Sequence, residues 1–208
     1  MDLIAFPALL AFAGTSILIE LTPGPNMIYL AIVAASHGRR LGFATVLGVA
    51  LGLGIVGLAA ALGLAAVIAA SPPLYQALRI GGVIYLLWLA WDGWRDAGQG
   101  ATAPQHPPGW GASFRRGLIT NLLNPKAGVF YVAVLPTFVD PARSIMPQTV
   151  MLSLVYVAVA TAIHAGIVIL AGAAQHLLQD PVRSRIIRRA LSLALAGAAI
   201  WFGWKTAI

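Results

Sequence analysis

The chain contains one glutamate, Glu20, which stands two residues before the break Thr22-Pro23-Gly24-Pro25-Asn26 in an otherwise apolar segment. A second apolar segment, in the other half of the chain, is interrupted at Asn124-Pro125-Lys126. A proline removes a helix hydrogen bond, and hydrocarbon offers no water to replace it, so such breaks persist only against protein or a wet cavity. Paired breaks in corresponding positions of two halves are typical of the substrate site of a secondary transporter. The pattern therefore predicts a carrier whose site lies between the two breaks.

The residue types around the breaks suit a zwitterion, which presents a carboxylate and an ammonium group. A half-helix that begins near Gly24 would offer free backbone N–H groups and the positive end of its dipole to the carboxylate. Lys126 adds a positive charge, and Glu20 would either receive the ammonium group or carry a proton that is exchanged for substrate. Side chains able to replace water by hydrogen bonding are expected at the same depth, namely Thr22, Asn26, Asn121 and Asn124.

These residues also have structural interpretations, which the sequence leaves open. Glu20 and Lys126 could form an ion pair across the two breaks, and removal of one partner would then leave a destabilising lone charge. Asn124 could simply satisfy backbone groups freed by Pro125. His164, in a later apolar segment, either relays protons, because imidazole titrates near neutrality, or is a neutral histidine hydrogen-bonded within the bundle.

The composition identifies the elements that must hold these residues. Of 208 residues, 60% are hydrophobic and 9% are charged, and the mean hydropathy is +0.87. Because a soluble domain carries about 25% charged residues, the chain is predicted to be an integral membrane protein. The sequence contains no cysteine, which excludes disulfides, thiol redox chemistry and thiolate metal sites.

The apolar segments predict an all-α membrane protein with about six spans, since each span takes about 20 apolar residues. The expected segments are residues 4–35, 41–70, 78–94, 117–139, 147–178 and 190–206, of which the first and fourth carry the proline breaks. They divide into a first three-helix repeat (1–96), a cytoplasmic linker (97–113) and a second three-helix repeat (114–208).

The basic residues predict the orientation of these segments. Most of them fall on one side, which positive-inside topology assigns to the cytoplasm: Arg39, Arg40, Arg95, Arg115, Arg116, Arg183, Arg185, Arg188 and Arg189. The opposite side has Arg79, Arg143 and Lys205, so both termini are expected to face the periplasm or the exterior. The net charge of +7 then reflects topology and contact with anionic membrane lipids, and no nucleic-acid partner is expected.

An odd number of spans in each half requires that any repeat between the halves be inverted. A shift of 102 positions aligns Pro23 with Pro125 and Tyr29 with Tyr131, and a shift of 110 aligns Trp91 with Trp201. The two matched tyrosines follow the breaks by one or two helical turns. They would line the pathway, act as gates or pack in the core.

Longer stretches resemble the LysE/RhtB family of bacterial amino-acid exporters. Residues 20–26 (E-L-T-P-G-P-N) and 36–42 (S-H-G-R-R-L-G) resemble its amino-terminal signature, and residues 121–127 (N-L-L-N-P-K-A) resemble its second signature. Residues 82–91 are similar to its G-x-x-Y-L-x-W-L-G-x stretch, with Ala90 in the glycine position. The resemblance implies an inner-membrane exporter of amino acids or close derivatives, driven by the proton gradient and without a cofactor.

Two other functions fit the sequence less well. A divalent metal exporter of the same superfamily would need several carboxylates, histidines or thiolates together, whereas the apolar core offers one Glu, one His and a repelling Lys. An intramembrane enzyme would need a motif such as G-x-S-x-G or H-E-x-x-H, and neither occurs. One acid and one base in the core favour neutral or hydroxylated amino acids over basic ones. The particular amino acid, the ion stoichiometry and the oligomeric state, a homodimer included, stay open.

Overall fold

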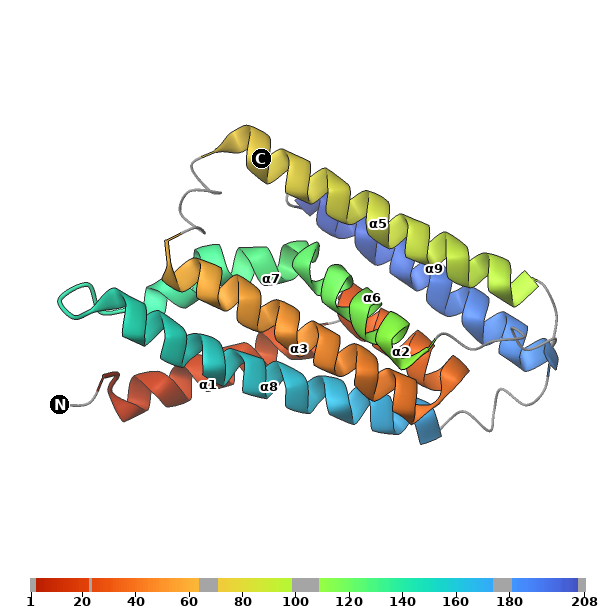
Figure 1. The fold of residues 1–208 in the computed structure, drawn as a ribbon, viewed down its shortest axis with the longest axis horizontal. Coiled ribbons are helices and arrows are strands. Elements are labelled where there is room, and N and C mark those ends of the chain that lie inside the picture. Colours follow the sequence, from red (N-terminus) through yellow and green to blue (C-terminus); the bar gives the residue numbers. More distant parts are fainter. Residues whose placement is uncertain (1–2, 23, 64–70, 99–108, 174–180, 206–208) are drawn as a thin grey trace.

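The computed structural model describes residues 3–22, 24–63, 71–98, 109–173 and 181–205, and over these ranges the chain is all-helical, as expected (Figure 1). The elements are α1 (Phe6–Leu21), α2 (Pro25–His37), α3 (Arg39–Ala61), α5 (Pro72–Gly98), α6 (Trp110–Leu122), α7 (Pro125–Val129), the π-helical turn η1 (Phe130–Val134), the 3-10 turn η2 (Leu135–Phe138), α8 (Ile145–Ala173) and α9 (Pro181–Lys205).

Both expected helix breaks are present. The axes of α1 and α2 meet at 62°, and α6 meets the helical run Lys126–Phe138 at 50°. Pro25 and Pro125 each begin the helix that follows a break, where the missing N–H would have no intrahelical acceptor. Asn124 caps the second of these helices, because its side-chain Oδ1 accepts from the backbone N–H of Lys126 at 3.1 Å. Pro23 lies outside the described residues.

Helix length and apolarity identify between two and four membrane spans among the described residues. α3 and α8 are long and apolar enough to cross a membrane, and each bent pair also qualifies when it is counted as one span. α5 contains the shorter apolar stretch Ile80–Asp92. By this criterion, at most four of the six expected spans are identified among the described residues.

Several helices extend beyond the apolar segments that predicted them. α9 begins at Pro181 rather than near residue 190, and α6 begins at Trp110, inside the expected linker 97–113. Hydropathy misses these turns because they carry arginines, whose long side chains a helix tolerates where it leaves the hydrocarbon. Parts of the predictions lie outside the described residues: the linker over 99–108, the segment ends near residues 70, 178 and 206, and the side chains of Arg79, Arg183, Arg188 and Lys205.

α3 packs closely against both α6 and α8. Gly48 lies against the backbone carbonyl of Phe114 in α6, where a Cβ would collide, and a Cβ at Gly52 would come 2.8 Å from Nδ2 of Asn121. Together with the buried Ala44, these glycines let the two helix backbones approach each other. The small residues on α3 thus serve packing within the chain.

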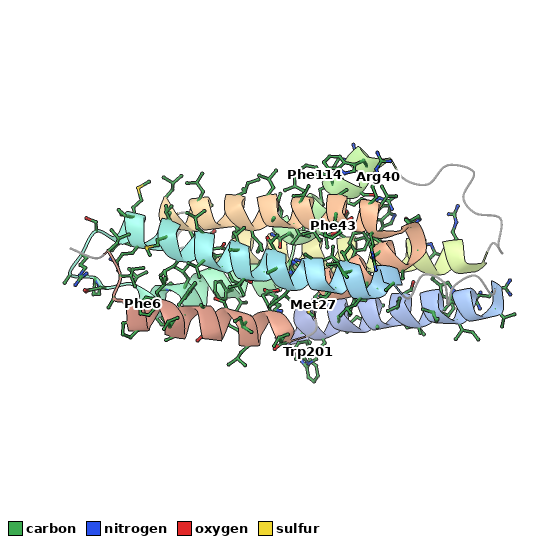
Figure 2. All side chains as sticks on the ribbon, turned by 90° about the horizontal axis from the view of Figure 1, so that it is seen from below. Phe6, Met27, Arg40, Phe43, Phe114 and Trp201 are labelled. Carbon is green, nitrogen blue, oxygen red and sulfur yellow. The ribbon has the colours of Figure 1, made fainter. Side chains whose placement is uncertain are left out.

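The outer surface of the bundle is apolar, as lipid contact requires. α5 and α9 lie side by side along one edge of the bundle in Figure 1 and pack against α2. Figure 2 shows Phe6 and Trp201 projecting outward, and both side chains are exposed. Some polar side chains are instead buried, among them Glu20, Asn26, Asn121 and Asn124 beside the two helix breaks.

Candidate functional site

The carboxylate of Glu20, buried in the last turn of α1, faces three side chains from the second half of the chain. The Tyr156 hydroxyl donates to Oε1 at 2.6 Å. Nε2 of His164 lies 3.3 Å from Oε2, and Nζ of Lys126 lies 3.9 Å from Oε1. One acid therefore meets a hydroxyl donor, an imidazole and an ammonium group in the interior.

Sequence reasoning missed Tyr156. Tyr156 and His164 are eight residues apart on α8, a spacing that places both on one face of the helix. Because His164 is a candidate from the sequence, the same spacing along the helix would point to Tyr156 as a second candidate. A tyrosine in an apolar helix is otherwise indistinguishable from a core residue.

Lys126 connects the two breaks. Its Nζ donates to the backbone carbonyl of Thr22 at 2.9 Å, at the C-terminal end of α1, where the helix dipole is negative. The Lys126 side chain is 10% exposed. Thr22 contributes this carbonyl rather than its hydroxyl, which donates to the carbonyl of Leu18 at 3.2 Å.

A second contact joins the two breaks through side-chain amides. Nδ2 of Asn26, in the first turn of α2, donates to Oδ1 of Asn121, in the last turn of α6, at 2.9 Å. Asn26 is 6% exposed and Asn121 is 0% exposed. The predicted polar residues of the two halves thus bind each other directly.

One pocket collects most of the predicted residues. Those that line it are Glu20, Gly24, Asn26, Asn121, Asn124, Lys126 and His164. Tyr156 and the apolar Met27, Leu53 and Ala127 complete the wall, and Thr22 is not among the described residues that line it. The space between these side chains has room for about one water molecule.

Tyr29 and Tyr131 lie outside the lining of the pocket, in two different environments. Tyr29 packs with Leu86 in the apolar cluster between α2, α5 and α9. The Tyr131 hydroxyl donates to the carbonyl of Leu53 at 2.9 Å, and its ring contacts that of Tyr156 with centroids 5.6 Å apart. A role of either tyrosine as pathway lining or gate stays a prediction.

The pocket can neutralise both ends of a zwitterion, because it has one acid, one base, an imidazole and several neutral donors and acceptors. Among the residues that the structure describes, no three His, Asp or Glu side chains gather closely enough to hold a metal ion. The chemistry of the wall is therefore that of hydrogen bonds and single charges.

Comparison with known proteins agrees with this arrangement. The family model of the LysE type translocator matches residues 17–206. An uncharacterized membrane protein of Vibrio cholerae is 30% identical over 173 residues, which cover 83% of this chain and 84% of that protein. Homoserine/homoserine lactone efflux proteins of Salmonella typhimurium and Salmonella typhi are each 28% identical over 193 residues, 91% of this chain and 94% of theirs. None of the solved protein structures matches the chain significantly.

These matches confirm the resemblance seen in the sequence, since the family model covers both helix breaks and the helices from α2 to α9. The chain belongs to the LysE type translocator family, and it is accordingly a membrane efflux translocator and not an enzyme.

Proposed function

We propose that the protein exports amino acids or close derivatives, neutral or hydroxylated in preference to basic, across the bacterial inner membrane in exchange for protons. The observation that carries the proposal is the burial of Glu20 and Lys126 in one pocket between two broken helices. An ionisable group within a membrane costs about 2.5–3.5 kcal/mol even on lenient scales, so a translocator retains such a pair for its cargo.

The pocket offers a place for each charged end of an amino acid. The first N–H groups of α2, at Asn26 and Met27, have no acceptor within the helix, and together with Lys126 they suit a carboxylate. Glu20 suits the ammonium group. A basic amino acid would bring a second cation beside Lys126, and the described residues that line the pocket include no second carboxylate, which favours neutral substrates.

The relatives from Salmonella support a small, hydroxylated cargo. Their names state efflux of homoserine and homoserine lactone, and they align with nearly the whole of this chain. We extend that class of substrate to this protein because the charges that line its pocket are balanced.

Glu20 is also the proposed site of proton coupling. Its Oε2 lies 3.3 Å from Nε2 of His164, so a proton could pass directly between the carboxylate and the imidazole. A protonated Glu20 no longer attracts an ammonium group, so substrate and proton compete for the same oxygen atoms.

We further propose six spans in two inverted repeats, residues 1–96 and 114–208 joined by a cytoplasmic linker at 97–113, with both termini on the outer side. The packing supports this arrangement: α3 lies against α8 and α5 lies against α9, so each pair takes one helix from each half. A two-fold axis in the membrane plane would map each of these pairs onto itself.

Efflux from cells preloaded with mixed amino acids tests the function. The wild-type protein is compared with Glu20→Gln/Lys126→Met at equal expression in the membrane, in the presence and absence of a proton gradient. We expect gradient-dependent release of one or a few neutral amino acids, lost in the variant. Equal release of every amino acid from both would refute the proposal and direct the search to peptides, lactones and metals.

A further inference from the structure

The bond between Asn26 and Asn121 leaves hydrogen-bonding capacity unused on two side chains that line the pocket. Among the residues that the structure describes, neither Oδ1 of Asn26 nor Nδ2 of Asn121 has a hydrogen-bond partner, although both atoms are buried. If both asparagine amides are turned by 180°, the hydrogen bond runs in the opposite direction. One acceptor and one donor are then still left without a partner. Buried polar groups in native proteins are paired with few exceptions, so this pair calls for a further partner.

The charged ends of an amino acid have better partners elsewhere in the same pocket. Glu20 offers a full negative charge to the ammonium group, and Lys126 offers a full positive charge to the carboxylate. A neutral amide competes poorly with either, because hydrogen bonds to an ionised partner are roughly twice as strong. The spare acceptor and donor of the asparagine pair therefore remain for the side chain of the substrate.

A hydroxyl group matches the pair, since it donates one hydrogen bond and accepts others. Met27, Leu53 and Ala127 line the same pocket and suit one or two methylene groups between the charged end and the hydroxyl. The side-chain amide of Asn121 packs against Gly52, in space that a Cβ atom at residue 52 would restrict, and this close packing holds Asn121 in position.

We propose that Asn26 and Asn121 form a specificity subsite that binds the side-chain hydroxyl of a short amino acid. This inference rests on the proposed function, because it assigns a role within the same pocket. It makes the two asparagines specificity-determining residues, distinct from the charged residues that hold the ends of the substrate.

The test compares two substrates that differ by the hydroxyl alone, L-homoserine and L-2-aminobutyrate, in proteoliposomes with an imposed pH gradient. L-serine and L-alanine form a second pair. A site built around a hydroxyl leaves its buried amides unpaired when the hydroxyl is missing, so we expect the wild-type protein to prefer each hydroxylated substrate by about tenfold or more in kcat/KM.

The matched variant is Asn26→Leu/Asn121→Leu, which replaces both amides by apolar side chains of similar size and leaves neither partner unpaired. We expect the preference to fall below about twofold because transport of the hydroxylated substrates declines. A second variant, Gly52→Ala, retains both amides and displaces that of Asn121, so it should lower the preference even where the double variant fails to fold.

The outcomes separate the inference from the function on which it rests. Equal transport within each pair by the wild-type protein would overturn the subsite, while amino-acid export would stand. The subsite would also be overturned, and amino-acid export would stand, if the wild-type protein exports only amino acids outside these pairs. Folded variants that keep the wild-type preference would lead to the same conclusion. Release of no amino acid at all would overturn the proposed function and the subsite with it.

Discussion

Neutralising Glu20 and Lys126 singly and together separates a structural ion pair from a role in transport. The two groups lie 3.9 Å apart, with side chains 6% and 10% exposed. Two unit charges at that distance attract by about 4 kcal/mol at an effective dielectric constant of about 20. Glu20→Gln and Lys126→Met each remove this attraction and leave the other charge buried.

Other contacts of the pair limit the cost of each single change. The Glu20→Gln amide oxygen can still accept from the Tyr156 hydroxyl, and Lys126 keeps its bond to the carbonyl of Thr22. We therefore expect each single variant to lose about 2–3 kcal/mol of unfolding free energy, at or below the usual cost of breaking a buried pair. The double variant should lose only about 1 kcal/mol, because it also removes two desolvated charges. The coupling energy of the cycle is then about 4 kcal/mol.

Reversible unfolding of the purified proteins in mixed micelles measures these free energies. Asp140→Asn/Arg143→Gln is the matched control, because it neutralises an ion pair whose side chains are 48% and 51% exposed. We expect that control to change stability by less than about 1 kcal/mol and to leave efflux unchanged. A coupling energy near zero would mean that Glu20 and Lys126 do not act as a pair.

Transport by the double variant decides the role of the pair. A double variant that folds with only this small loss of stability but is unable to export shows that the charges act on cargo or protons. Export at the wild-type rate by the same variant would refute that reasoning, since the pair would then be structural alone.

Three further changes probe the surroundings of the pair. Tyr156→Phe keeps the ring stacked in the core but removes the 2.6 Å bond to the Glu20 carboxylate, so we expect a loss of about 1.5–3 kcal/mol in thermal or denaturant unfolding together with slower efflux. His164→Gln should keep substrate exchange across proteoliposomes and lose its acceleration by a pH gradient; unchanged acceleration would remove His164 from the coupling. Gly48→Ala places a methyl group against a backbone carbonyl of α6 and should destabilise by about 1–3 kcal/mol or more, whereas Gly54→Ala on the same helix, with open space around it, should be neutral or stabilising.

The helix breaks could be predicted from sequence because their causes are local. Pro25 and Pro125 end the preceding helical hydrogen bonding wherever they stand, and a single acid or lysine in an apolar segment is conspicuous at once. Two such breaks with opposite charges predicted a shared site, and Glu20 and Lys126 do line one pocket.

Contacts that depend on the path of the chain could not be predicted in the same way. The bond from Tyr156 to Glu20 joins residues 136 positions apart, and the only local sign of Tyr156 is its eight-residue spacing from His164 on α8. The pairing of Asn26 with Asn121 is equally remote in sequence, although both had been candidates. Thr22 is predicted from its side-chain type, and in the structure its backbone carbonyl accepts from Lys126; a role of its hydroxyl in substrate binding stays a prediction.

On the proposed function, an amino-acid cargo and a proton would exclude each other at Glu20. A pocket with room for about one water molecule cannot hold an amino acid, so binding must separate groups that now touch. The attraction between Glu20 and Lys126 opposes that separation in the empty protein. A zwitterion compensates for its loss, because the ammonium group takes Glu20 and the carboxylate takes Lys126. A proton on Glu20 also removes the attraction, but it leaves no anion for the ammonium group. On this proposal, either event would release the attraction that holds the pocket together and each would exclude the other, which is the condition that an exchange of substrate for protons requires.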